Sequence, residues 1–139
     1  MSDRKNSRRL GRSVLALLGG FVAVVVLSIG TDVLMNKIAI FPKLGDPMTD
    51  KLLLLATAYR TIYGVAGSYI TARLAPYRPM LHALVGGIVG LVLSTAGAIA
   101  AWNQAVAIEH HWYPLALIAT VMPTAWAGGK ICEAQLGAR

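Results

Sequence analysis

Two ionisable residues inside apolar segments are the first candidates for chemistry in this sequence. Arg60 lies within an apolar segment at residues 52–74, and Asp32 lies near the end of another at residues 13–35. A charge held in hydrocarbon is costly, so such residues usually mark either a structural ion pair or a solute path. Arg60 and Asp32 are therefore assigned as a buried ion pair or a possible solute site, and both interpretations stay open here.

Helix geometry favours contact between these two side chains. If the two segments are antiparallel helices, a rise of about 1.5 Å per residue places Arg60 roughly 12 Å, and Asp32 roughly 5 Å, below the same end of the bundle. Side chains tilt toward the N-terminus of their own helix, so the two residues lean toward one another. A long arginine can bridge the remaining gap, and we expect an ion pair between the two helices.

A second cluster of polar residues predicts no metal site. Glu109, His110 and His111 are adjacent in the sequence, and Asp46 and Asp50 belong to the other loop at the same end. Neighbouring histidines on a helix point about 100° apart, and neither HxxxH nor HxxE spacing is present. The cluster is better interpreted as a polar cap on a helix end.

Catalytic groupings are not recognisable in the sequence. It contains no Ser-His-Asp set, no paired catalytic carboxylates, no P-loop and no Cys-x-x-Cys motif. The single cysteine, Cys132, cannot form an internal disulfide. His82 follows Arg78 closely at a segment end, where we expect it at the membrane interface. We predict no enzyme activity, no cofactor and no metal.

The elements that must position these residues are membrane-spanning helices. Of 139 residues, 56% are hydrophobic and only 14% are charged, and the charges lie almost entirely between four apolar runs. Each run has about 20 residues, enough for a helix to cross a bilayer core about 30 Å thick. Continuous hydrophobicity favours helices over a barrel. The prediction is an all-α polytopic membrane protein, a single four-transmembrane-helix domain at residues 1–139, with spans at about 13–35, 52–74, 80–101 and 113–131.

Small residues predict where these helices touch, because close backbone approach supplies much of the attraction between helices in lipid. The residues assigned to helix packing are Gly64, Gly67, Gly86 and Gly90. The spacing of Gly86 and Gly90 also suits a dimer, although packing within one chain is favoured. The short, proline-containing connection at residues 75–79 predicts a tight antiparallel hairpin of the second and third spans.

The distribution of Lys and Arg predicts the orientation. Nine lie on the side of the two termini, five of them within residues 1–12, and three lie in the opposite loops. The positive-inside rule then places both termini in the cytoplasm, with residues 1–12 as a basic tail that can attract anionic lipid. A net charge of +7 does not indicate nucleic acid, because the basic residues do not interleave with aromatics on a folded, soluble surface.

One stretch resembles a known group of proteins. Residues 63–76 read Tyr-Gly-Val-Ala-Gly-Ser-Tyr-Ile-Thr-Ala-Arg-Leu-Ala-Pro, and residues 78–84 read Arg-Pro-Met-Leu-His-Ala-Leu. This pattern is similar to one in small uncharacterised bacterial inner-membrane proteins. The resemblance implies a bacterial inner membrane and a four-helix body, and it implies no activity. Small multidrug transporters are similar in size only, since the first span here lacks their membrane-embedded glutamate.

Two functions follow from this reasoning. The loops are too short to form a soluble active site, so the leading expectation is a non-enzymatic accessory or structural membrane module, acting as a homo-oligomer or with a partner membrane protein. The alternative is a small oligomeric transporter or channel that uses Arg60 for an anion or polar solute. A transporter needs a polar cavity that reaches Arg60, whereas a module should show Arg60 closed off by Asp32.

Overall fold

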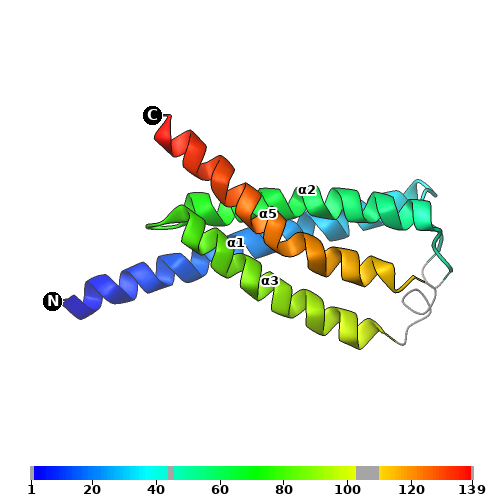
Figure 1. Ribbon diagram of the computed structural model, residues 1–139, viewed down its shortest axis with the longest axis horizontal. Helices are drawn as coiled ribbons and strands as arrows, with labels where there is room; N and C mark the ends of the chain where they lie inside the picture. Colours follow the sequence, from blue (N-terminus) through cyan, green and yellow to red (C-terminus); the bar gives the residue numbers. More distant parts are fainter. Residues whose placement is uncertain (1, 44–45, 103–109, 139) are drawn as a thin grey trace.

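The computed structural model describes residues 2–43, 46–102 and 110–138, with side chains described from residue 10 onward. This part of the chain is all-helical (Figure 1) and contains four helices: α1 (Ser2–Lys37), α2 (Asp50–Leu74), α3 (Pro79–Ala101) and α5 (Trp112–Gly137). The prediction of an all-α fold is confirmed.

Three of the described helices are long and apolar enough to cross a membrane. They are residues Leu10–Lys37, Pro79–Ala101 and Trp112–Gly137, with mean hydropathies of 2.5, 2.1 and 1.3. The long side chains on these helices mostly point outward, whereas the buried apolar residues are mainly alanine. An apolar exterior around small buried residues suits contact with lipid, and it indicates a membrane protein. α2 is of similar length but less apolar, because it carries charged residues at both ends and Arg60 between them.

The helix bounds agree closely with the predicted spans at one end of the molecule and exceed them at the other. α1 continues back to Ser2, and α5 continues to Gly137, past the predicted end at residue 131. Neither extension contains proline. Good helix formers occur in both, with Arg and Lys in the α1 extension and Glu and Ala in the α5 extension. Backbone hydrogen bonding therefore continues beyond the apolar segments, and both termini project from the same end of the bundle (Figure 1).

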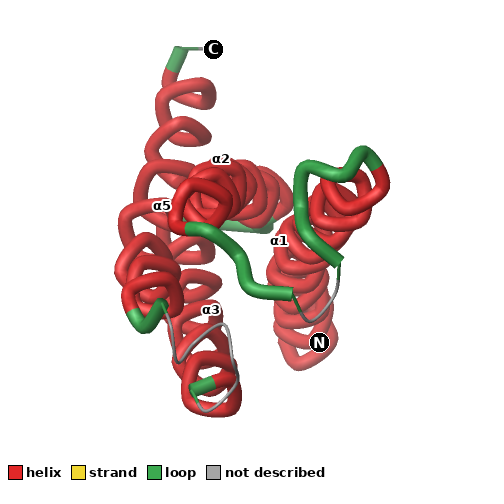
Figure 2. Tube along the Cα trace, turned by 90° about the vertical axis from the view of Figure 1, so that its right-hand side faces the viewer, coloured by secondary structure: helices red, strands yellow, loops and turns green. Residues whose placement is uncertain are grey.

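α2 lies between α1 and α5 and packs extensively against both (Figure 2). α5 also packs along α3, whereas α1 and α3 touch only lightly. The predicted hairpin of α2 and α3 is tight only at its connection, where Arg78 adopts a left-handed backbone conformation and Pro79 begins α3. Toward the other end α5 packs between α2 and α3 and separates them (Figure 1).

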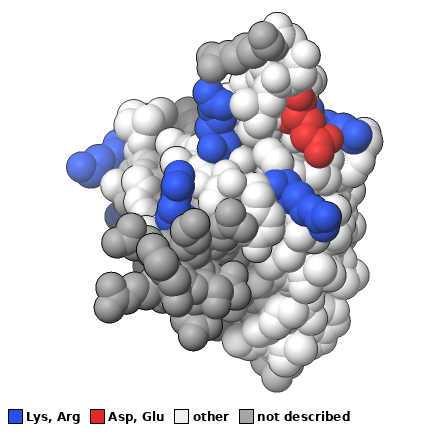
Figure 3. Space-filling model, turned by 90° about the vertical axis from the view of Figure 1, so that its left-hand side faces the viewer, with Lys and Arg blue, Asp and Glu red and all other residues white. Residues whose placement is uncertain are grey.

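The end that carries both termini is predominantly basic. Figure 3 views the molecule from this end and shows Lys and Arg spread over it, with a smaller acidic area. Arg12, Arg73 and Lys130 lie toward this end of their helices, and Lys130 contacts Glu133 at 3.5 Å. Four further basic residues of the predicted tail, Arg4, Lys5, Arg8 and Arg9, have side chains outside the described part of the chain.

Candidate functional site

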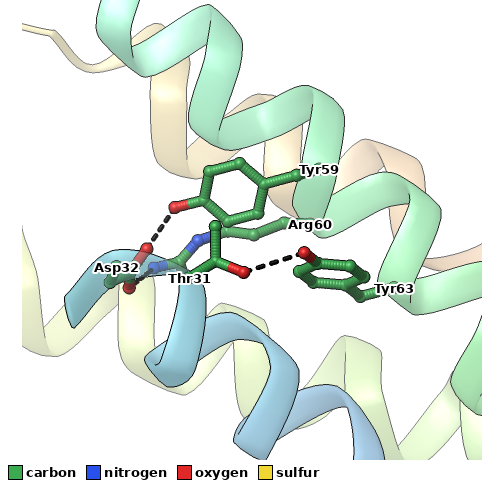
Figure 4. A network of polar contacts seen from close by, with 5 residues as sticks. All are labelled: Thr31, Asp32, Tyr59, Arg60 and Tyr63. Carbon is green, nitrogen blue, oxygen red and sulfur yellow. Dashed lines mark hydrogen bonds and ion pairs between the residues drawn. The ribbon is translucent and has the colours of Figure 1, made fainter. Parts of the chain in front are cut away.

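Arg60 of α2 and Asp32 of α1 face each other across the contact between their helices (Figure 4). Arg60 Nη2 donates to Asp32 Oδ2 at 2.6 Å, so the two form a hydrogen-bonded ion pair. Each side chain is 34% exposed in the isolated chain. The structure thus brings the two assigned residues together, in a half-buried rather than a dry environment.

Two tyrosines complete this polar network. Tyr59 donates its hydroxyl to Asp32 Oδ1, so both carboxylate oxygens have partners. One turn along α2, the Tyr63 hydroxyl lies 2.8 Å from Thr31 Oγ1 of α1. Sequence reasoning missed these residues, although a signal was present: each is a polar residue beside, or one turn from, an assigned charge inside an apolar segment. Together these contacts join α1 to α2.

One buried N–H donor of Arg60, at Nε, has no hydrogen-bond partner among the described residues. Buried polar groups normally have partners, so an unpaired guanidinium N–H is an unusual feature. Both oxygens of Asp32 already accept a hydrogen bond, so the buried group left unpaired at this site is a donor.

Arg60 also lines two cavities. One, named the outer cavity, lies at the end of the bundle opposite the termini and has a volume of about 470 Å³. Its lining includes Asp32, Lys37, Lys43, Asp46 and Tyr113. The central cavity has a volume of about 270 Å³ and is lined by residues from α1, α2, α3 and α5. Arg60 belongs to both linings. Pairing with Asp32 therefore does not close Arg60 off from the space between the helices.

The four assigned packing glycines all face other helices. A Cβ atom at Gly67 would lie 2.8 Å from Gly20 O of α1, and one at Gly64 would lie 3.0 Å from Thr124 Oγ1 of α5. Gly86 and Gly90 are looser, because their Cβ atoms would reach the side chains of α1 and α5 at 3.3 and 3.4 Å. The first two allow close helix approach, whereas the second two lie near ordinary contact distance.

Three close approaches were not assigned from the sequence. A Cβ atom at Gly128 would lie 2.6 Å from Val65 O, one at Gly87 would lie 2.6 Å from Ala125 Cβ, and one at Gly129 would lie 2.7 Å from Met80 Sδ. All three belong to contacts of α5. The small residues were visible in the sequence, but the rotation of α5 against its neighbours was not.

A polar contact links α2 and α5 at the end of the bundle opposite the termini. Trp112 Nε1 donates to Asp50 Oδ1 at 2.8 Å, and His110 Nδ1 lies 2.9 Å from the same oxygen. The His111 ring packs on Trp102 instead. Asp46 lines the outer cavity, and Glu109 lies outside the described residues. Among the described residues, no group of three or more His, Cys, Asp and Glu could hold a metal.

At the opposite end His82 and Cys132 are buried. His82 Nε2 lies 2.9 Å from Ser13 Oγ of α1, and its ring packs edge-on against Tyr77. The interfacial place of His82 stays a prediction, and the structure adds that its side chain joins α3 to α1. Cys132 is fully enclosed beside Ala72 and Ala83.

Comparison with known proteins gives no relative from which a role could be transferred. No family model, no curated protein and no solved structure matches this chain. Function is therefore inferred from the geometry of the site.

Proposed function

We propose that this chain is a non-enzymatic, four-span protein of the bacterial cytoplasmic membrane that conducts or carries a small anion or polar solute past Arg60, working as a homo-oligomer. The observation that supports this proposal most is the position of Arg60 in the linings of both cavities. A charged residue that lines a cavity within a membrane-spanning bundle is a feature of solute paths. We therefore favour a solute path over a purely structural role for Arg60.

The position of α2 supports a fourth crossing. α1 ends and α3 begins at opposite ends of the bundle, so α2 must run the whole length between them (Figure 1). Its 25 residues would extend about 37 Å. Arg60 and Tyr59 turn toward α1, while Leu54 and Ile62 point outward. If α1 and α3 cross the bilayer, α2 crosses it too.

We predict that both termini are cytoplasmic, because the basic end of the bundle carries them. In a Cys132→Ala background, Lys43→Cys should react with an impermeant thiol reagent added to intact cells. Tyr77→Cys, an exposed position in the α2–α3 connection, should react only after permeabilisation. Native Cys132 is fully enclosed and so cannot report the orientation, and its removal leaves the introduced cysteine as the single thiol to be labelled. The reverse pattern would overturn the orientation and, with it, attraction of the basic tail to anionic lipid of the inner leaflet.

Solute passage is testable in proteoliposomes with formate as anion, glycerol as neutral solute and potassium as cation. We expect formate or glycerol, and not potassium, to cross faster than in protein-free vesicles. Arg60→Met should remove most of that excess, whereas Leu54→Ala, on the outer face of the same helix, should leave it unchanged. Rates equal to those of empty vesicles for all three solutes would contradict the proposal.

A second candidate is an accessory or structural membrane module, and one observation favours it. Asp32 pairs with Arg60 and also accepts from Tyr59, as expected for a structural contact that holds α1 to α2. A module would show no solute passage, and it should instead co-purify at fixed stoichiometry with one partner membrane protein.

A further inference from the structure

Several hydroxyl groups that line the central cavity have no hydrogen-bond partner among the described residues. Ser and Thr side chains in membrane helices commonly bond to a carbonyl one turn earlier, as Thr57, Thr61 and Thr124 do here at 2.7–2.8 Å. Four hydroxyls in the cavity lining form no hydrogen bond with any described residue: Ser28, Ser68, Thr71 and Ser94. They come from three helices and converge on one space.

Burial makes this lack of partners significant. Ser28 is 8% exposed and Thr71 is 4% exposed, yet neither hydroxyl is hydrogen-bonded. Neither oxygen is fully enclosed, so both keep accessible surface at the cavity that they line, where polar groups normally bond to water or ligand. Arg60, whose buried Nε has no partner among the described residues, belongs to the same lining.

The polar groups are distributed along the depth of the bundle. From Arg60 to Thr71 is eleven residues of α2, or about 16 Å along the helix axis. Beyond Thr71, α2 continues into the buried cluster of Ala72, Ala83 and Cys132. The polar part of the cavity lining therefore follows α2 from Arg60 to Thr71.

We infer that the central cavity is a hydrated binding compartment for a small neutral or anionic solute that carries hydrogen-bond acceptors. The lining contains the guanidinium of Arg60, several hydroxyls and no carboxylate among the described residues. Donors thus outnumber charged acceptors, and a cation has no counter-charge there, since Asp32 is paired with Arg60 and is not part of this lining. A volume of about 270 Å³ suits a molecule smaller than a drug-sized ligand. This inference deepens the proposed function and rests on it for the route by which the solute arrives.

Cysteine accessibility tests for water in the compartment. In a Cys132→Ala background, Ser28→Cys, Ser68→Cys and Ser94→Cys are near-isosteric changes on three different helices, so one misfolded variant does not decide the result. Matched controls are Ile88→Cys and Val92→Cys on the outward face of α3. The probes are two impermeant methanethiosulfonates of similar size, one with a sulfonate and one with a trimethylammonium group.

We expect the compartment thiols to react at least about tenfold faster than the α3 controls, because thiosulfonates need a hydrated thiolate. The sulfonate reagent should be several-fold faster than the cationic one, a preference that Arg60→Met should remove. Reaction no faster than at Ile88→Cys and Val92→Cys, for all three positions, would overturn the inference. Reactive thiols without solute uptake in proteoliposomes would instead retain the compartment and reject transport, whereas uptake with unreactive thiols would place the path elsewhere.

Discussion

Arg60→Met is expected to lower the free energy of unfolding in detergent by on the order of 2–3 kcal/mol, and Asp32→Leu by a similar amount. Each change strands a partner that is hydrogen-bonded in the native protein, since Asp32 bonds to both Arg60 and Tyr59. Breaking a fully buried pair costs about 3–5 kcal/mol, but these side chains are one-third exposed and reach two cavities, so water reduces the loss.

The double variant tests whether Arg60 and Asp32 stabilise the fold together or only lie close to each other. If the pair is a unit, Arg60→Met with Asp32→Leu should lose clearly less than the sum of the two single losses, because no unpaired charge remains. Chemical denaturation of the purified variants measures all four corners of this cycle. Additive losses would show that the two residues do not stabilise the fold together, whatever their distance.

The same variants also distinguish the two candidate functions. If the ion pair is purely structural, the double variant should recover both stability and the cellular activity of the protein. A solute site predicts recovered stability with lost passage, because methionine supplies no donor to the cavities. Tyr59→Phe is a useful intermediate, since it removes one hydrogen bond to Asp32 and leaves the ion pair in place.

Gly128→Ala is expected to destabilise the protein by on the order of 2–3 kcal/mol, although alanine is the better helix former. A Cβ atom there would lie 2.6 Å from Val65 O and 2.7 Å from Tyr69 N, and both are backbone atoms of α2. A side chain can rotate away, but a helix backbone cannot yield without moving the whole helix. α5 would therefore have to withdraw from α2 along one of the largest contacts in the bundle.

Gly97→Ala is the matched control for this change. No atom lies within 4 Å of a Cβ at Gly97, which faces outward on α3. It should leave stability unchanged or raise it by up to about 1 kcal/mol, through helix propensity alone. Thermal unfolding in the same detergent compares the two variants directly. Equal midpoints would contradict the close approach of α5 and α2 at Gly128.

Much of the fold was determined by the sequence alone. Long apolar runs separated by charged loops specify helices and approximately where each one begins and ends, because a backbone in lipid must satisfy its own hydrogen bonds. The proximity of Arg60 to Asp32 was also predictable, since helix rise and side-chain tilt constrain depth and direction once two segments are antiparallel. These are properties of single helices or of one simple pair.

Other features were decided only by the tertiary structure. Whether a serine such as Ser28 bonds to its own helix or faces a cavity depends on rotamer and neighbours, not on spacing. Whether a glycine bears a close contact, as Gly128 does and Gly90 does not, depends on how each helix is rotated and where it crosses the next. The central cavity at Arg60 is lined by all four described helices, in a bundle where α1 and α3 touch only lightly. Helix rotation and crossing follow from the packing of all the helices together, so no single segment of the sequence specifies them.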